Sequence, residues 1–479
     1  MPVATHPIKF GTDGWRGVIA ADFTFERVNY LAPLAAKVLA DNYGTVNNNR
    51  LVIVGYDRRF MAEEFAKSAA EAIQAAGFDV WLSQTYAPTP AFSWAAKAYN
   101  ALGAIVMTAS HNPANYLGLK VKGAFGGSVS PEITKQIEAL LGQENLSESK
   151  PGKLELFDPW ESYVAGLRAK VNIEAIKDAV ATGKIKVFAD VMHGAAAGGL
   201  SKLLGIEINE LNGDRDPLFG GHAPEPLPHN LAQFLTTIKE ESEKGDDVLR
   251  VGFAFDGDCD RIAASDGEGN FLSSQILIPI LIEHLAQRKS LTGEVVKTVS
   301  GSDFIPQVAE SFGLSLHQTP IGYKYIADRM LSTEVLIGGE ESGGVGYGHH
   351  IPERDALMSA LFVLEAMVES GKDLGTLYRQ LREKLGFDAA YDRIDLPLAS
   401  MDVRTKLLER LENEPINTVA GKEVTNCLTA DGYKFRLADD SWLLIRFSGT
   451  EPLLRLYCEA STIKDVQETL AWAKNWAVS

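Results

Sequence analysis

Three aspartates at alternate positions, Asp256, Asp258 and Asp260, are the sharpest chemical signal in the sequence. They follow an apolar run that predicts a buried strand, and a glycine between the first two permits a tight bend. Carboxylates in this arrangement can converge on one hard divalent cation such as Mg²⁺, which commonly shares its oxygen ligands with a substrate phosphate. A solvated acidic turn is the structural alternative, but repulsion among clustered carboxylates next to a buried strand favours the metal site. The adjacent Arg261 could reach a phosphate on that metal.

Ser110 is a second candidate for chemistry, within the sequence Thr-Ala-Ser-His-Asn-Pro at 108–113. The apolar run at 104–107 predicts a buried strand that ends just before it. The serine hydroxyl therefore falls on a loop, where function tends to concentrate. We interpret Ser110 as the carrier of a phosphoryl group. Serine, asparagine and proline also form ordinary turns, and the local sequence favours neither interpretation.

Arginines among glycines and hydroxyl residues mark two possible anion sites. Arg16 lies in the segment Phe10–Gly17, where glycines on both sides could present it to an anion. A phosphate cradle needs hydroxyls, a glycine for close backbone approach and an arginine for bidentate contact. Near the C-terminus these types occur together at Arg446, Ser448, Gly449, Thr450 and Arg455. Turns with solvated arginines are the structural alternative at both places.

Two loops between these sites complete the candidates. The loop Thr319–Lys324 precedes a predicted helix whose N-terminus is a natural anion site, and Lys324 is a candidate substrate ligand. The loop Gly338–Gly344 follows a predicted strand and carries Glu340 and Ser342. Its carboxylates do not favour phosphate, but they can accept hydrogen bonds from sugar hydroxyls. A flexible polar turn is equally compatible with the second loop.

Alternation of strands and helices must position these loops. Strands are expected at 51–54, 80–82, 104–107, 186–189, 251–255, 295–299 and 335–337, and helices at 61–76, 231–244, 275–287, 304–312 and 323–331. Such alternation predicts right-handed βαβ units and parallel sheets. Ligands bind beyond the carboxyl ends of the strands in these sheets, which is where Ser110 falls.

The pattern changes near residue 388, where strands alternate with hairpin turns and predict an α+β unit with an antiparallel sheet. The length of 479 residues also requires several cores. We therefore expect four units, at 1–150, 151–265, 266–387 and 388–479.

Overall composition limits the class of protein. The net charge of −17 argues against a nucleic-acid partner, and any phosphorylated ligand must be held by local Arg and Lys clusters. No apolar run approaches the roughly 20 residues of a membrane span, and residues 1–10 have no apolar signal core. The cysteines are Cys259, Cys427 and Cys458, without metal-ligand spacing. We expect a cytoplasmic protein with reduced thiols.

The order of these motifs resembles the α-D-phosphohexomutases, in particular bacterial-type phosphoglucomutase/phosphomannomutase. The motifs that carry the resemblance are Phe10–Gly17, Thr108–Pro113, Asp256–Arg261, Gly339–Gly343 and Arg446–Pro452. The resemblance covers essentially the whole chain. It implies four domains around a central cleft, three of them related α/β units with mixed sheets and the fourth a smaller α+β domain.

The resemblance also implies a role for each candidate residue. Ser110 would be the phosphoserine, with His111 beside it, and Lys120 matches the family lysine near the phosphoryl group. Mg²⁺ would be held by the phosphoserine and the three aspartates, while Arg16 and Arg261 would hold the transferring phosphoryl group. The substrate ligands would be Glu340, Ser342, Arg446, Ser448, Gly449 and Thr450, with assistance from Arg455, and Lys324 stays a candidate from its position ahead of a helix. Either Lys120 or His111 could serve as the general base.

The implied activity is interconversion of glucose 1-phosphate and glucose 6-phosphate through a bound glucose 1,6-bisphosphate. Relatives that act on mannose or glucosamine phosphates often end the sugar loop in histidine, whereas this chain has Gly344. Glucose therefore ranks first, mannose second and glucosamine third. An enzyme that releases the bisphosphate, a glucose 1,6-bisphosphate synthase, would use the same residues. A non-catalytic phosphosugar-binding regulator is the alternative from another class, and the sequence does not indicate the oligomeric state.

Overall fold

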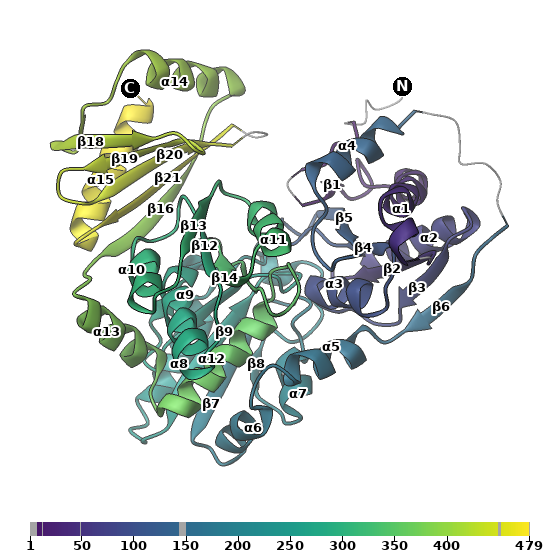
Figure 1. The fold of residues 1–479 in the computed structure, drawn as a ribbon, viewed down its shortest axis with the longest axis horizontal. Helices are drawn as coiled ribbons and strands as arrows, with labels where there is room; N and C mark the ends of the chain where they lie inside the picture. Colours follow the sequence, from purple (N-terminus) through teal and green to yellow (C-terminus); the bar gives the residue numbers. More distant parts are fainter. Residues whose placement is uncertain (1–6, 12, 48, 143–149, 449–451, 479) are drawn as a thin grey trace.

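The computed structural model describes residues 7–478 except 12, 48, 143–149 and 449–451. Its chain forms three α/β units followed by a C-terminal sheet unit (Figure 1). The first unit lies on one side of the molecule, the second and third lie together in the middle, and the C-terminal unit packs above the third. This architecture confirms the predicted class of three α/β units with mixed sheets plus a fourth unit of different build.

The first unit is built on a six-stranded sheet in the order β1-β5-β4-β2-β3-β6. Its strands are β1 (Trp15–Val18), β2 (Leu51–Tyr56), β3 (Asp79–Ser83), β4 (Gly103–Met107), β5 (Tyr116–Gly123) and β6 (Leu154–Phe157), and its helices are α1 (Phe25–Asn47), α2 (Ala62–Ala75), α3 (Thr89–Ala98) and α4 (Pro131–Ala139). Strands β2, β3, β4 and β6 run parallel, and β5 turns back antiparallel to β4. The chain thus completes this sheet only at β6, beyond residue 150.

The second unit has five strands in the order β11-β10-β9-β7-β8. Its strands are β7 (Ile185–Asp190), β8 (Asn209–Leu211), β9 (Leu249–Phe255), β10 (Ile262–Ser265) and β11 (Phe271–Leu272), and its helices are α5 (Pro159–Arg168), α6 (Ile173–Ala181), α7 (Gly199–Leu204) and α8 (Ala232–Ser242). Strand β10 returns antiparallel to β9, so the aspartate loop joins two adjacent central strands. The Gly- and Pro-rich segment between β8 and α8 contains two short 3₁₀ turns, Phe219–Gly221 and Pro228–Asn230.

The third unit repeats the pattern with a four-stranded sheet in the order β13-β12-β14-β15. Its strands are β12 (Glu294–Thr298), β13 (Leu316–Thr319), β14 (Val335–Gly339) and β15 (Val345–Tyr347), and its helices are α9 (Ser274–Glu283), α10 (Phe304–Ser311), α11 (Tyr323–Ser332), α12 (Ala356–Ser370) and α13 (Leu374–Leu385). The helix predicted at 275–287 ends earlier as α-helix, because the chain widens into a π-helical turn at His284–Arg288. Strand β15 returns antiparallel to β14.

The C-terminal unit confirms the predicted antiparallel α+β build, with the strand order β16-β21-β20-β19-β18-β17. Its strands are β16 (Ala390–Pro397), β17 (Thr418–Val419), β18 (Lys422–Leu428), β19 (Tyr433–Leu437), β20 (Trp442–Phe447) and β21 (Leu453–Ala460), and its helices are α14 (Met401–Asn413) and α15 (Ile463–Val478). It has a separate hydrophobic core. By contrast, one continuous core runs through the second and third units and into the first.

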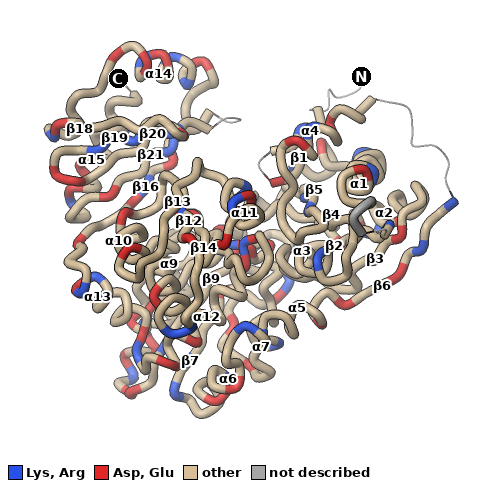
Figure 2. Tube along the Cα trace, viewed as in Figure 1, with Lys and Arg blue, Asp and Glu red and all other residues tan. Residues whose placement is uncertain are grey.

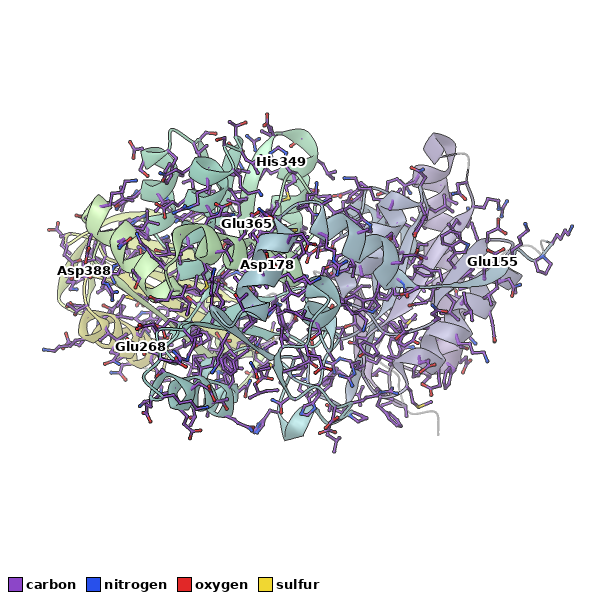
Figure 3. All side chains as sticks on the ribbon, turned by 90° about the horizontal axis from the view of Figure 1, so that it is seen from below. Glu155, Asp178, Glu268, His349, Glu365 and Asp388 are labelled. Atoms are coloured by element: carbon purple, nitrogen blue, oxygen red, sulfur yellow. The ribbon has the colours of Figure 1, made fainter. Side chains whose placement is uncertain are left out.

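Burial explains why the central strands read as apolar runs rather than as alternating patterns. Every residue of β2, β4, β12 and β14 is buried, because parallel sheets are covered by helices on both faces. Acidic residues are instead common on the surface, such as Glu155, Glu268 and Asp388 (Figure 3). None of the helices in the described part of the chain is long and apolar enough to cross a lipid bilayer.

Candidate active site

Ser110 lies just beyond the carboxyl end of β4 and contacts the aspartate loop of the second unit. Its hydroxyl donates a hydrogen bond of 2.8 Å to Asp256 Oδ2 and lies 3.3 Å from His111 Nδ1. The residue is buried, and its φ of 52° places it in the left-handed region. A non-glycine residue is held in this region only where its surroundings enforce it, and such positions cluster at functional sites. The structure therefore brings the predicted nucleophile and the predicted metal loop together.

Arg59 holds the backbone of the loop that carries Ser110. The sequence did not predict this role. Its guanidinium donates four hydrogen bonds to carbonyl oxygens, those of Ser110 and Asn112 at 2.6 Å, Pro113 at 3.0 Å and Tyr116 at 3.2 Å. The side chain is fully buried and lies 3.5 Å from the Asp57 carboxylate. The available signal was the polar run after β2, but that run does not show which arginine turns inward.

Backbone groups shape the aspartate loop. Asp256 Oδ1 accepts hydrogen bonds from the backbone N–H groups of Asp260 and Arg261, at 3.0 and 3.1 Å. A Cβ atom at Gly257 would lie 2.4 Å from the carbonyl oxygen of Ser110. Only glycine therefore permits this close approach of the two loops, and the loop bends back on itself with its carboxylates inward.

The three carboxylates could hold a metal ion, because one oxygen from each lies within 4.8 Å of the others. Oδ2 of Asp258 and Oδ2 of Asp260 pair with cationic side chains of the protein. Their Oδ1 atoms are buried and accept no hydrogen bond in the described structure. Buried carboxylate oxygens without a partner are costly, and oxygen is the ligand that Mg²⁺ prefers. The donor set therefore fits a hard divalent cation.

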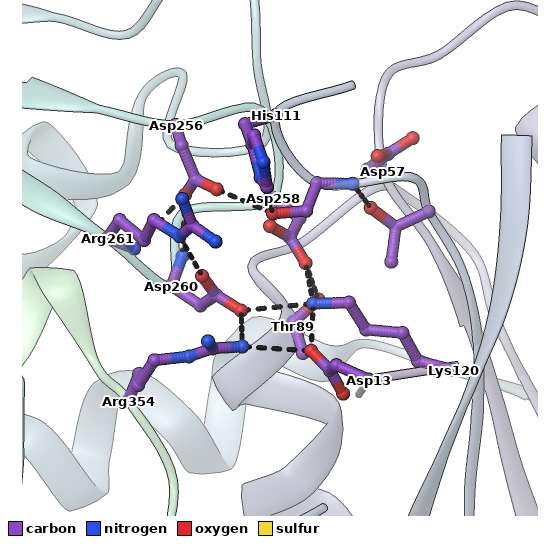
Figure 4. Close-up of polar contacts among 12 residues, drawn as sticks. Asp13, Asp57, Thr89, His111, Lys120, Asp256, Asp258, Asp260, Arg261 and Arg354 are labelled. Atoms are coloured by element: carbon purple, nitrogen blue, oxygen red, sulfur yellow. Dashed lines mark hydrogen bonds and ion pairs between the residues drawn. The ribbon is translucent and has the colours of Figure 1, made fainter. Parts of the chain in front are cut away.

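Lys120, on β5, is the central cation of the site (Figure 4). Its ammonium lies 2.7 Å from Asp13, 2.8 Å from Asp258 and 3.0 Å from Asp260. Burial by itself would lower the pKa of Lys120, but these three carboxylates outweigh burial and raise it above its usual value. The Lys120 ammonium thus forms ion pairs with three carboxylates, which favour its charged form.

Arg354 and Asp13 join this cluster, although neither was predicted as a site residue. Arg354 lies between β15 and α12, and one terminal nitrogen bonds Asp13 at 2.8 Å and Asp260 at 2.5 Å. Asp13 belongs to the first unit, Asp260 to the second and Arg354 to the third. Arg354 precedes the helix α12 without any surrounding glycine or hydroxyl motif, so its sequence carried no functional signal. Figure 2 shows basic and acidic segments close together where these units meet.

Three other cationic or basic side chains surround Ser110. Arg16 donates to the Asn112 side chain, and Arg261 lies 3.7 Å from Glu225 and 3.9 Å from Asp260. Burial, together with nearby arginines and Lys120, keeps the pKa of His111 well below its usual range, so that imidazole is neutral. The predicted phosphoryl ligands thus occupy one neighbourhood.

The predicted sugar loop, Gly338–Gly344, begins at the end of β14. It is joined to the predicted metal loop, Asp256–Arg261, and to the strand that follows that loop. The N–H of Ile262 donates to the Gly343 carbonyl at 2.9 Å, and Arg261 forms a bridge with Gly344. Glu340 is buried, which raises its pKa to about 7, and its Oε1 accepts a hydrogen bond from the Gly322 N–H. The predicted loop thus lies beside the metal loop, with Ser342 part-exposed.

The remaining candidates lie on α11 and in the C-terminal unit. Lys324 lies in the first turn of α11, with its ammonium 4.9 Å from the centroid of the Tyr325 ring. Arg446 and Arg455 are directly paired across β20 and β21, so they share one face of the sheet. A cavity of about 200 Å³ beside Arg446 is also lined by Arg404, Leu408, Thr429, Asp431, Gly432, Tyr433 and Phe447. Ser448 ends the described part of this loop, and the predicted ligands Gly449 and Thr450 lie outside the described residues.

Four family models cover most of the chain. The models of phosphoglucomutase/phosphomannomutase alpha/beta/alpha domains I, II and III match residues 7–148, 161–269 and 273–385. The model of the C-terminal domain of the same family matches residues 404–471. Each structural unit described above therefore corresponds to one family domain.

Individual relatives match this chain over nearly its full length. A protein of Thermus thermophilus assigned to the phosphomannomutases has a crystal structure with 33% identity and a TM-score of 0.84, covering 99% of this chain and 100% of that one. A phosphoglucomutase/phosphomannomutase of Thermococcus kodakarensis is 28% identical over 96% of each chain. A phosphoglucosamine/phosphogalactosamine mutase of Sulfurisphaera tokodaii is 29% identical over 94% of this chain and 95% of its own.

Fold, site and relatives together define a phosphosugar mutase, an isomerase that acts as an intramolecular phosphotransferase. The chain belongs to the phosphoglucomutase/phosphomannomutase family of the α-D-phosphohexomutases.

The hydrogen bonds of Arg59 predict that Arg59→Lys impairs turnover without abolishing the fold. Lysine keeps the positive charge, but its single ammonium cannot reach four carbonyl oxygens in a planar fork. We expect kcat to fall roughly 10²-fold, because a small displacement of the reacting group is enough for such a loss. Steady-state kinetics measures the effect, and Arg168→Lys is the matched control, since Arg168 also donates to carbonyl oxygens but lies away from the site. Equal kcat in the two variants would contradict the assigned role.

Proposed function

We propose that this chain interconverts glucose 1-phosphate and glucose 6-phosphate through a phosphoserine at Ser110 and a bound glucose 1,6-bisphosphate. One observation carries the proposal. The Ser110 hydroxyl donates a hydrogen bond to the aspartate loop, whose carboxylates could hold a metal ion. A separate pair of arginines, Arg446 and Arg455, lies on the C-terminal sheet. A sugar with a phosphate at each end needs one site for transfer and a second for holding the other phosphate.

The phosphoryl group moves in two balanced steps. In the first, the bond between phosphorus and Ser110 Oγ breaks and a bond between phosphorus and the free sugar hydroxyl oxygen forms; the hydroxyl proton passes to a base, and Ser110 Oγ takes up a proton. The bisphosphate then reverses its orientation in the site. In the second step the bond between its other phosphorus and the sugar oxygen breaks and a bond to Ser110 Oγ forms; Oγ gives its proton to the base, and the released sugar oxygen takes up a proton. The protein contributes positioning and charge stabilisation rather than new covalent chemistry.

The residues around Ser110 divide these tasks. Asp256, Asp258 and Asp260 would hold Mg²⁺, which stabilises negative charge on a phosphoryl group when bound. Arg16 and Arg261 neutralise and orient the transferring group. The two base candidates differ in geometry, since the Lys120 ammonium is committed to three carboxylates, whereas His111 Nδ1 lies beside the serine hydroxyl. His111 is the better placed of the two.

The sugar preference rests on the loop with Glu340 and Ser342, whose last glycine, Gly344, lacks the histidine side chain expected for mannose or glucosamine substrates. Relatives of similar identity carry names that cover glucose, mannose, glucosamine and galactosamine phosphates. We therefore propose glucose as the preferred sugar, followed by mannose and glucosamine. A non-catalytic regulator would need neither a serine poised in the left-handed region nor buried carboxylate oxygens suited to a metal.

Replacing Ser110 with alanine should abolish turnover while hexose phosphate still binds, because only the phosphoryl carrier is lost. Coupled assays and calorimetry measure the two quantities, and mass spectrometry should find phosphate on Ser110 in the purified active enzyme. Ser201→Ala, a change on α7, serves as the control. Full activity of Ser110→Ala, together with no phosphate on Ser110 in the parent enzyme, would refute the scheme.

Removing divalent cations with a chelator should stop turnover, and added Mg²⁺ should restore it. Asp258→Asn removes one of three converging charges, so the Mg²⁺ concentration for half-maximal activity should rise on the order of tenfold or more. Asp266→Asn, in the next hairpin, keeps the acceptor oxygen that its backbone contacts require and should leave this concentration unchanged. Turnover that is insensitive to chelation would rule out the metal site.

Product analysis separates mutase from bisphosphate synthase. With glucose 1-phosphate and catalytic glucose 1,6-bisphosphate, we expect glucose 6-phosphate to accumulate and the free bisphosphate level to stay constant. Growth of the free bisphosphate pool when a donor sugar bisphosphate is supplied would instead identify a synthase. The ratio of kcat/KM for glucose, mannose and glucosamine 1-phosphates measures the sugar preference, and a higher value for either of the latter would overturn the ranking.

A further inference from the structure

Asp431 connects the phosphate-binding face of the C-terminal unit to the third unit. It lies in the turn between β18 and β19, and its two carboxylate oxygens have different partners. Oδ1 accepts a hydrogen bond of 3.0 Å from Arg446 Nε, and Oδ2 accepts one of 2.8 Å from the backbone N–H of Ile321. The turn lies against the strand of Arg446, because a Cβ at Gly432 would be 2.6 Å from the Ile445 carbonyl oxygen.

This contact orients Arg446. Because Nε bonds Asp431, the two terminal nitrogens of the guanidinium remain, and within the described residues neither has a hydrogen-bond partner. The planar end of a guanidinium can bind two oxygens of one phosphate. The contact with Asp431 therefore leaves the terminal nitrogens of Arg446 for a ligand.

The segment bonded by Asp431 also reaches the sugar loop. Gly322, next to Ile321, donates its N–H to Glu340 Oε1 at 3.0 Å. Glu340 lies 3.8 Å from Arg354, which binds the metal-loop residue Asp260. A chain of polar contacts thus runs from Arg446 through the third unit to the metal loop.

Asp431 is not what anchors the C-terminal unit. Arg436 pairs with Asp303, and Lys434 donates to the Val299 carbonyl at 2.8 Å. The Trp442 ring packs in a cluster that includes residues of both units. These contacts hold the C-terminal unit on the third unit independently of Asp431. The hydrogen bonds of Asp431 can therefore serve to orient Arg446.

We propose that Asp431 is a positioning residue that holds Arg446 end-on at a set distance from the sugar loop. Through this contact the enzyme selects sugars that carry a phosphate remote from the reacting hydroxyl. The inference rests on the proposed function, in which Arg446 binds the phosphate that is not transferred.

Asp431→Asn tests the proposal, because asparagine has one acceptor oxygen and cannot satisfy both donors. We expect calorimetric affinities for glucose 1-phosphate and glucose 6-phosphate to weaken roughly tenfold each, the effect of losing one charge-assisted hydrogen bond. KM should rise in parallel, while kcat changes less. The slow transfer from phosphoserine to glucose, which has no phosphate for Arg446, should stay within about twofold, because it makes no use of this contact.

Asp440→Asn is the matched control, since Asp440 is exposed in the neighbouring hairpin with a φ of 65° that asparagine tolerates. In an Arg446→Lys background, which has no Nε, Asp431→Asn should add little further loss. Additive losses, equal behaviour of the two asparagine variants, or an equal slowing of transfer to glucose would each overturn the proposal. Binding without turnover by the parent enzyme would instead refute the proposed function, and the affinities would still report on Asp431.

Discussion

Burial of charge is the constraint on which the rest of this structure depends. Asp13, Asp258 and Asp260 lie around one buried ammonium, that of Lys120, with Arg354 beside it. Removing one member would leave an uncompensated buried charge, which costs several kcal/mol, about 3–5 in measured cases. The members come from three different units. The charge requirement therefore also holds these units in one relative arrangement, and Ser110, the proposed nucleophile, contacts the aspartate loop at this junction.

The same requirement explains how an acidic chain handles phosphorylated ligands. A net charge of −17 opposes any phosphate in solution, yet arginines are concentrated at the points where phosphate would lie. Arg16 and Arg261 lie near Ser110. Arg446 on β20 is directly paired with Arg455 on the adjacent strand β21. Partial neutralisation by neighbouring carboxylates keeps these cations in place before substrate arrives. Under the proposed function, a bound phosphate would replace these carboxylates as the anion next to the arginines.

Backbone geometry supplies the precision that charge alone does not. The left-handed φ of Ser110 and the close approach of Gly257 bring two loops into contact, and Arg59 ties the serine loop at four carbonyl oxygens. These contacts hold the Ser110 loop in one backbone conformation. In the C-terminal unit, Asp431 bonds the guanidinium of Arg446 and so restricts its orientation. Arg59 likewise restricts the loop that carries Ser110.

Local patterns in the amino-acid sequence were enough to single out Ser110, the alternate aspartates and the buried apolar runs. Each of these features depends on residues that are close together in the chain. Hydrophobic periodicity and turn patterns were enough to predict three α/β units and an antiparallel C-terminal unit, and the order of five motifs carried the resemblance to the family. Which distant charges meet depends instead on the folded chain. No local pattern shows which partners Arg59, Asp13, Arg354 and Asp431 acquire, up to 341 positions away along the chain, because charge pairing in a buried space depends on three-dimensional distance and not on order along the chain.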